Sequence, residues 1–421
     1  MRPRDTGASR RLSRWIPAIA APIAIGVGVV LVPMQANAAV DLPDLTPAEL
    51  LEFAASSEVD ALSGTVEQTS ELGLPDLSGL TGTMGGGTGG SGGSGGFGSG
   101  GGDGDSDGGG AAEASATDLD DLISLATGTH TARVYLDGSN ARLQVLDRLA
   151  ERDVYVSDDD AWIYDSAEKA ATHLTVDQAA LDALKAEAEA RDEEARARLE
   201  AELGAPLPTP EEVLDQALAR LDETTEVSVG TDARVAGREV YELVLVPRDA
   251  DTLVGEISVA IDGDTGVALA ASVTARGADE AAFSVAFTDV SFEAPDASVF
   301  AFTPPDGTDV TEHVVPVPTV AELEQWTAEA EAGEETGDER MPQPIVHGEG
   351  WSSVVELPAG AVGAAGLDGE TSAMLDTLTE RVDGGRILST SLVTVLITDE
   401  GRVLAGAVSA DRLLDAAASG R

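Results

Sequence analysis

Two glycine-rich stretches match motifs that position a catalytic nucleophile or a phosphate group. Gly89-Gly90-Ser91-Gly92-Gly93 fits G-x-S-x-G, in which a strand and a helix present a reactive serine for acyl transfer. Gly85-Gly86-Gly87-Thr88-Gly89-Gly90 fits G-x-G-x-x-G, which binds a dinucleotide between a strand and a helix. Both lie within residues 79–110, which contain 19 of the 47 glycines. Such a segment cannot bury enough apolar surface to fold, so we predict a flexible loop and no catalytic residue.

The acidic run at the end of this segment imitates a calcium-binding loop. Asp103, Asp105 and Asp107 have the spacing of its first ligands, but the loop must end on a bidentate glutamate. Ala114 occupies that last position, and Glu113 comes one residue too early. The histidines lie too far apart in sequence to form a local metal pair; they are His130, His173, His313 and His347. We therefore predict no metal and no cofactor.

The composition excludes several kinds of partner and site. A net charge of -51 repels nucleic acid and anionic lipid headgroups, so we predict no nucleic-acid partner. The chain has no cysteine, which excludes disulfides, thiol catalysis and a lipid-modified cysteine. At 421 residues it is longer than one ordinary domain.

Residues 1–38 are typical of an export signal. Five arginines precede an uncharged apolar run from Trp15 to Val32, and Ala36-Asn37-Ala38 fits a cleavage site. An uncleaved N-terminal anchor helix is the alternative, because the apolar run approaches the length that spans a bilayer.

Three segments carry the signature of a helix start. Thr46-Pro47-Ala48-Glu49 and Thr209-Pro210-Glu211-Glu212 combine a threonine N-cap, a proline at the first helical position and a glutamate that completes a capping box. Thr319 and Glu322 repeat the box without proline. Apolar residues after the first two starts recur at helical spacing, so each helix should have one apolar face. A further short helix is predicted over Asp118 to Leu125.

Residues 177–203 predict a different kind of helix. They are rich in alanine and charge, with i,i+4 pairs such as Glu187 and Arg191. The apolar stripe is thin, so we predict a solvated helical insertion. A coiled coil with a partner is the alternative, and the lack of a sustained leucine heptad disfavours it.

Between the helices, apolar and polar residues alternate with a period of two. Trp162 and Tyr164 share one face of a predicted strand, and residues 243–246 are apolar on both faces. Asp262-Gly263-Asp264-Thr265-Gly266 supplies the turn of a hairpin. Successive strands with short turns predict an antiparallel meander.

The character of the chain changes after residue 310. Residues 311–348 are acidic and contain proline, which predicts a linker with one short helix. Residues 349–421 predict a small C-terminal α+β module. Its strands are expected over 351–357, 388–397 and 403–408, with a turn at Asp399-Glu400-Gly401 and a helix from Ala410 to Ser419.

Four of these segments together resemble a known family. They are Leu62 to Thr69 as a first strand, Trp162-Ile163-Tyr164, the Asp262–Gly266 turn, and Phe300 to Val310 as the final strand. In this order they are similar to the LolA/RseB-like lipoprotein carriers, actinobacterial type. The resemblance covers residues 45–310 and implies an α+β fold for residues 39–310. That fold is an unclosed antiparallel β-barrel (half-barrel) of about eleven strands with covering helices.

The resemblance also implies a function without catalysis. It is that of an exported lipid or lipoprotein carrier or chaperone of the cell envelope, with acyl chains held in an apolar cavity. An RseB-like regulator that senses lipid and binds a membrane anti-sigma factor is the alternative. A hydrolase is disfavoured, because no Ser/His/Asp set stands in a suitable context. The expected cavity residues are Leu50, Leu51, Phe53, Val213, Leu214, Leu218, Ile257, Val259, Ile261, Val273, Phe283, Val285 and Phe287.

Overall fold

The computed structural model describes residues 42–74, 128–146, 151–157, 160–187, 191, 223–322, 325, 344–359 and 377–419. Several sequence predictions lie outside these residues. They are the export signal, the glycine-rich loop 79–110, the helix over Asp118 to Leu125, and the helix after Thr209 with its cavity candidates Val213, Leu214 and Leu218.

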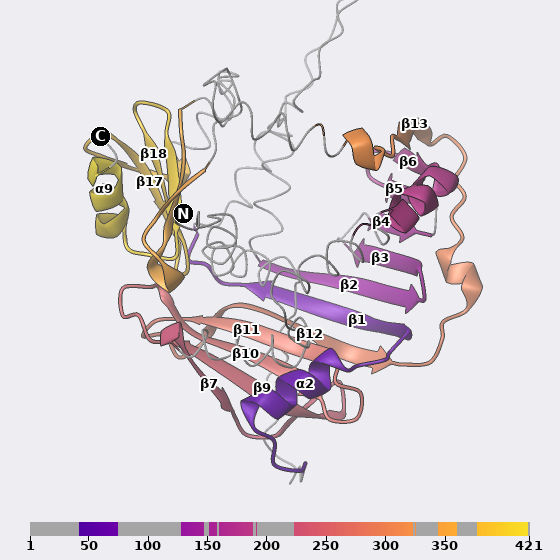
Figure 1. Ribbon diagram of the computed structural model, residues 1–421, viewed down its shortest axis with the longest axis horizontal. Coiled ribbons are helices and arrows are strands. Elements are labelled where there is room, and N and C mark those ends of the chain that lie inside the picture. Colours follow the sequence, from indigo (N-terminus) through magenta and orange to yellow (C-terminus); the bar gives the residue numbers. More distant parts are fainter. Residues whose placement is uncertain are drawn as a thin grey trace, which may run out of the picture.

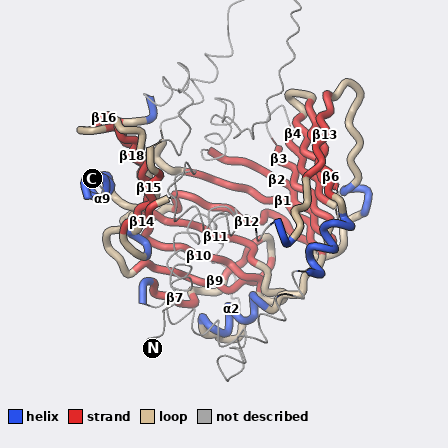
Figure 2. The backbone as a smooth tube through the Cα atoms, turned by 45° about the horizontal axis from the view of Figure 1, so that its top comes forward, coloured by secondary structure: helices blue, strands red, loops and turns tan. Residues whose placement is uncertain are grey.

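Most of the described chain forms one curved sheet (Figures 1 and 2). Within the described residues it has 13 strands in the order β13-β6-β5-β4-β3-β2-β1-β12-β11-β10-β9-β7, with β8 paired to β9. The strands are β1 (Ala61–Ser70), β2 (Gly128–Asp137), β3 (Asn140–Leu146), β4 (Glu151–Val156), β5 (Asp160–Asp165), β6 (Ala170–Val176), β7 (Thr225–Val229), β8 (Ala233–Val235), β9 (Arg238–Pro247), β10 (Val254–Asp262), β11 (Ala268–Ala275), β12 (Ala281–Ser291) and β13 (Asp309–Val315).

The sheet is open and almost entirely antiparallel. Only β13 runs parallel to its neighbour, β6, among the pairs formed by the described strands. The end strands β7 and β13 do not pair with each other in this part of the chain, so the sheet does not close into a barrel. The predicted unclosed antiparallel half-barrel is confirmed, with a longer sheet than the expected eleven strands.

The closing strand begins later than the sequence predicted. Ala297–Phe300 form the 3-10 helix η1, capped by the Asp296 side chain, which accepts a hydrogen bond from the backbone N–H of Ser298 at 2.8 Å. The strand starts only at Asp309. The prediction of a strand from Phe300 was wrong because Pro304 and Pro305 have no N–H to donate to a neighbouring strand.

Helix α2 (Pro47–Ala55) begins at the predicted capping box. The Thr46 hydroxyl oxygen accepts the Glu49 N–H at 3.3 Å, and the Glu49 carboxylate accepts the Thr46 N–H at 2.8 Å. Leu50 is fully buried against the sheet, in a cluster with Tyr241 and Leu243. The helix is therefore anchored over β7, β9 and β10 (Figure 1).

Two further helical segments agree with the sequence. The backbone N–H of Thr319 donates to the Glu322 carboxylate at 2.7 Å, and the Glu322 N–H donates to the Thr319 hydroxyl at 3.2 Å, as the capping box predicts. Residues 178–187 are helical, and Arg191 forms the expected i,i+4 ion pair with Glu187 at 2.9 Å. The rest of the predicted insertion 177–203 lies outside the described residues.

The hairpin turn between β10 and β11 forms where predicted and is anchored by a buried carboxylate. Asp262 is fully buried, and its Oδ1 accepts hydrogen bonds from the backbone N–H and the hydroxyl of Thr265, each at 2.8 Å. Arg238 forms an ion pair with the same carboxylate. Burial raises the pKa of Asp262, but the bonds from Arg238 and Thr265 outweigh it, and the pKa lies below its usual value.

The C-terminal module is a second sheet backed by a helix. Its strands, in the order β14-β15-β19-β18-β17-β16, are β14 (Ile345–His347), β15 (Val354–Leu357), β16 (Glu380–Val382), β17 (Gly385–Ser389), β18 (Thr394–Thr398) and β19 (Val403–Gly406). Helix α9 (Ala410–Ser419) packs Leu413 into a core with Val354, Leu396 and Leu404. The β18–β19 hairpin and the terminal helix agree with the sequence.

Two predicted strands of this module differ from the structure. Trp351 belongs to the 3-10 helix η2 (Gly350–Ser352), and β15 starts after it. The predicted strand 388–397 is split, because the Thr390 hydroxyl accepts the N–H groups of Leu392 and Val393 at 3.3 and 2.9 Å. A threonine side chain that binds the backbone in this way forms a turn.

The module is joined to the large sheet where the central strands β1, β10, β11 and β12 begin or end (Figure 1). The backbone N–H of Leu253 donates to the carbonyl of Ala407 at 2.7 Å, and the Ser391 N–H donates to the Leu72 carbonyl at 2.9 Å. Leu392 is buried in a cluster with residues of the large sheet, including Val254, Ala275 and Ala282. Apolar packing and backbone hydrogen bonds therefore hold the two sheets together.

Candidate functional site

Strand pairing assigns the residues of the large sheet to two faces. Directly paired residues share a face, and successive residues along a strand alternate between faces. Val259 packs in the α2 cluster, and the face that carries it is called the inner face; the opposite one is the outer face. Val259 pairs with Ala271, Ala271 with Val285, and Val285 with Gln68. The inner face thus continues from α2 to the middle of the sheet.

The same face continues into the strands beyond β1. Gln68 pairs with His130, and alternation along β2 brings Val134 to the inner face. Val134 pairs with Leu143, which leads by register to Val154 and then Ile163. The inner face therefore runs from α2 across to β5 as one surface rich in apolar side chains.

Large apolar side chains stay exposed on this far part of the inner face. Leu143 is 41% exposed, Val156 39% and Ile163 45%. An apolar group of this kind on a concave surface is typical of a binding site for an apolar ligand. These three residues were not among the predicted cavity residues, although the period-two alternation of β3, β4 and β5 is a signal that could have indicated them.

The described cavity candidates fall into three packed groups. One lies under α2, with Leu50 and Ile261 buried; its other members are Leu51, Phe53 and Val259. A second lies beside the C-terminal module and contains Ile257, Val273 and Phe283. Val285 and Phe287 pack in a third cluster within the strands. Their contact with an acyl chain stays a prediction.

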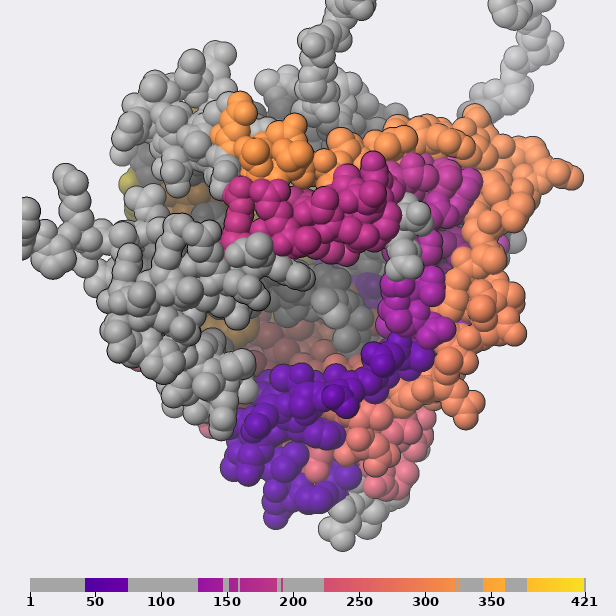
Figure 3. Space-filling view, turned by 45° about the vertical axis from the view of Figure 1, so that its right-hand side comes forward, coloured from indigo at the N-terminus to yellow at the C-terminus, as the bar shows by residue number. Residues whose placement is uncertain are grey.

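A space-filling view shows that the molecule is hollowed beside the inner face. In Figure 3 the hollow opens between α2, in indigo, and the magenta segment that contains residues 178–187. Helices on two sides of an open, curved sheet leave room between them that a closed barrel would not.

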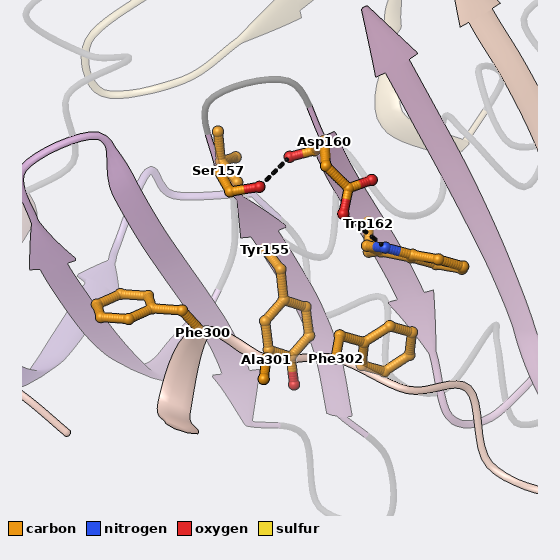
Figure 4. Close-up of a pocket in the computed structure, with 8 residues that line it drawn as sticks. Tyr155, Ser157, Asp160, Trp162, Phe300, Ala301 and Phe302 are labelled. Carbon is orange, nitrogen blue, oxygen red and sulfur yellow. Dashed lines mark hydrogen bonds between the residues drawn. The ribbon is translucent and has the colours of Figure 1, made fainter. Parts of the chain in front are cut away.

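The outer face of β4 and β5 carries a group of aromatic rings. Phe302, from the segment after η1, lies 4.8 Å from Tyr155 and 5.3 Å from both Trp162 and Tyr164 between ring centroids. Beside them is a cavity of about 180 Å³, called here the aromatic pocket (Figure 4). Its lining residues are Tyr155, Val156, Ser157, Asp160, Trp162, Phe300, Ala301 and Phe302. Val156 lies at the end of β4.

Charged groups hold this aromatic surface in place. Arg142 donates to the Asp153 carboxylate at 2.9 and 2.7 Å, and its guanidinium lies 4.7 Å from the centroid of the Tyr155 ring. Burial, followed by the negative charge of Asp153, raises the pKa of Tyr155 to about 12. The phenol therefore stays neutral at physiological pH.

Within the described part of the chain, no group of three or more histidine, aspartate or glutamate side chains could hold a metal ion. Among the same residues, no helix is both long and apolar enough to cross a membrane.

No family model matches the chain, and no curated protein matches it. Among solved structures, a chain of the Pseudomonas aeruginosa MucA/MucB complex is similar at 13% identity and a TM-score of 0.38, covering 88% of this chain and 96% of that chain. A LolA superfamily protein from Nitrosomonas europaea is similar at 10% identity and a TM-score of 0.21, covering 62% and 99%. A putative outer membrane lipoprotein-sorting protein domain from Vibrio parahaemolyticus is similar at 11% identity and a TM-score of 0.20, covering 60% and 95%. The open antiparallel sheet with α2 on its inner face agrees with the fold class predicted from the sequence.

Proposed function

We propose that the chain is a non-catalytic, extracytoplasmic protein that holds the acyl chains of a lipid or lipoprotein against the inner face. The observation that carries this proposal is the exposure of Leu143, Val156 and Ile163 on the inner face of the curved sheet (Figure 1). The alternation and register of β3 to β5 place all three side chains on the same side of the sheet as α2.

The energetics suit an acyl ligand. Burial of apolar surface stabilises a complex by about 0.8 kcal/mol for each methylene group. Roughly ten buried methylenes would therefore offset most of the entropic cost of association. Specific polar contacts are not needed for binding of this size, which agrees with an inner face rich in valine, leucine and isoleucine.

The export signal predicted from residues 1–38 supports a location outside the cytoplasm. A net charge of -51 disfavours direct docking on anionic phospholipid. Delivery of a lipid would then need a membrane protein partner with a basic surface.

Ile163→Asp tests the proposal. A carboxylate at this position would have to lose water beside an acyl chain, so uptake of a fluorescent fatty acid should weaken by at least roughly tenfold. Val314→Asp is the matched control, because Val314 is 75% exposed and its register with β6 places it on the outer face of the same sheet. Fluorescence titration of the full chain gives both affinities.

Mass spectrometry of lipid extracted from the exported wild-type protein is the second measurement. We expect co-purified acyl lipid in the wild type and in Val314→Asp, and much less in Ile163→Asp. A wild-type protein that carries no lipid and takes up no fatty acid would contradict the proposal. Equal affinities of the two variants would contradict the assignment to the inner face.

A regulator that senses lipid and binds a membrane anti-sigma factor is the second candidate. The attachment of the C-terminal module beside Ile257, Val273 and Phe283 favours it, because a ligand on the inner face could then influence the module. For a regulator, capture of its membrane partner by the full chain should change severalfold between lipid-loaded and lipid-free protein. For a carrier, capture of a membrane partner should not change in this way between lipid-loaded and lipid-free protein.

A further inference from the structure

The aromatic rings of the pocket lie on the outer face, and Val156, at the end of β4, is the residue that the pocket shares with the proposed acyl site. Tyr155 and Trp162 pair directly and alternate with Val154 and Ile163, which belong to the inner face. We propose that the aromatic pocket binds a small organic cation of the alkylammonium or quaternary ammonium class.

Trp162 is the first part of the argument. His173 stacks on one face of its ring, with centroids 3.9 Å apart and planes 8° apart. Trp162 also lines the pocket, so part of its ring is accessible from it. The faces of aromatic rings carry negative potential and attract cations, with tryptophan the strongest.

The neighbouring rings extend this cation-binding surface. Phe302 lies 5.3 Å from Trp162 and 4.8 Å from Tyr155, so three rings converge on one wall of the pocket (Figure 4). The Tyr155 ring already accepts one cation, because the Arg142 guanidinium lies 4.7 Å from its centroid. Clusters of rings of this kind recognise quaternary ammonium groups.

A carboxylate supplies the opposite charge. Asp160 lines the pocket, and its Oδ2 accepts the Trp162 indole N–H at 3.2 Å. Its Oδ1 forms a hydrogen bond with the imidazole of His173. Both contacts hold the carboxylate beside the ring that would contact the cation. The net charge of -51 adds a long-range attraction for cations.

The size of the pocket limits the ligand. At about 180 Å³ it is smaller than the roughly 300–1,000 Å³ typical of drug-sized ligands. A trimethylammonium or short alkylammonium group suits this space, and a whole lipid does not. The group belongs either to a free quaternary ammonium compound such as choline or to the headgroup of a choline lipid.

Calorimetric titration of the full chain with choline tests the proposal. The comparison ligand is the neutral carbon analogue of choline, in which a tert-butyl group replaces the trimethylammonium group. Shape and apolar area are nearly the same, so only the charge differs. We expect choline to bind roughly tenfold tighter than the analogue. Vesicles of phosphatidylcholine, with phosphatidylglycerol vesicles as reference, then distinguish a lipid headgroup from a free quaternary ammonium compound.

Variants localise the site. Trp162→Leu should abolish choline binding, and Asp160→Asn should weaken choline severalfold while leaving the neutral analogue unchanged. Ile163→Ala is the matched control, because Ile163 follows Trp162 directly on β5 but faces the inner side, so the variant should bind choline as the wild type does. Thermal melting of each variant checks the fold, and Asp160→Asn keeps the test valid if Trp162→Leu unfolds.

Equal binding of choline and its neutral analogue would overturn the proposal, as would the absence of choline binding at millimolar concentration. Retention of choline binding in folded Trp162→Leu would also overturn it. Fatty-acid uptake serves as an independent readout, because the weaker choline binding of Asp160→Asn should leave acyl binding intact.

Discussion

Truncation of Leu392 should loosen the C-terminal module from the large sheet. Leu392 is 4% exposed and is the buried residue that the module contributes to the cluster with Val254, Ala275 and Ala282. Leu392→Ala removes three carbon atoms, for a transfer loss of about 2.4 kcal/mol. The cavity left behind adds to this, which places the total at about 3 kcal/mol.

The backbone hydrogen bonds between the two sheets give a local readout of this loss. The N–H groups of Leu253 and Ser391 donate across the contact at 2.7 and 2.9 Å. If the contact opens locally, 3 kcal/mol should speed hydrogen exchange of these two amides by roughly 100-fold. Exchange followed by mass spectrometry or NMR on the folded full chain measures this change.

Leu396→Ala is the matched control, since Leu396 is also a buried leucine but packs inside the module with Val354 and Leu404. It should speed exchange throughout the module core. Leu392→Ala should instead act first on Leu253 and Ser391. If Leu392→Ala leaves the exchange of both amides unchanged, this packing does not hold the two sheets together.

Three further changes test the local architecture. Asp262→Asn breaks the buried pair with Arg238 and should cost about 3–5 kcal/mol in urea unfolding. Because the pKa of Asp262 is lowered, the stability that its carboxylate contributes is fully present at neutral pH and is lost as the pH falls below the ordinary range of aspartate. Asp262→Asn should therefore lose less stability on acidification than the wild type does, and equal pH profiles of the two proteins would contradict this. Thr46→Ala removes the N-cap of α2 and should lower the unfolding free energy by about 1 kcal/mol, whereas an unchanged midpoint would show that the cap is dispensable. Gly64→Ala would place a Cβ 2.7 Å from the Phe287 ring and should lower the unfolding free energy by about 1–3 kcal/mol in the same assay. An unchanged unfolding free energy would refute this prediction.

Local chemistry explains which elements the sequence could predict. The capping box at Thr46, the turn at Asp262 and the period-two alternation each depend on residues a few positions apart. Such patterns can be recognised from the residues of one short segment alone. They indicated an antiparallel meander with helices, and the structure confirms it; the open, unclosed form of the sheet was implied by the family resemblance.

The rest depends on partners distant in sequence. Phe302 packs on Tyr155 and Trp162, although nothing near position 302 indicates these contacts. Pro304 and Pro305 indicate that no strand starts at Phe300, whereas the family resemblance implied a strand at this position. The exposure of Leu143 and Ile163 follows from strand register and curvature, which alternation alone does not specify.

The two proposed sites are linked by the alternation of β4 and β5. Val154 and Ile163 pair on the inner face, whereas Tyr155 and Trp162 pair on the outer face one residue away. A slip of one residue in either strand would exchange the two surfaces, so both sites depend on the same register. Arg152 and Asp165 pair directly at the end of β4 and β5 away from their turn, and their side chains form an ion pair at 3.0 Å that is consistent with this register. A change in register would therefore abolish both activities together, whereas Ile163→Asp and Trp162→Leu should each remove only one.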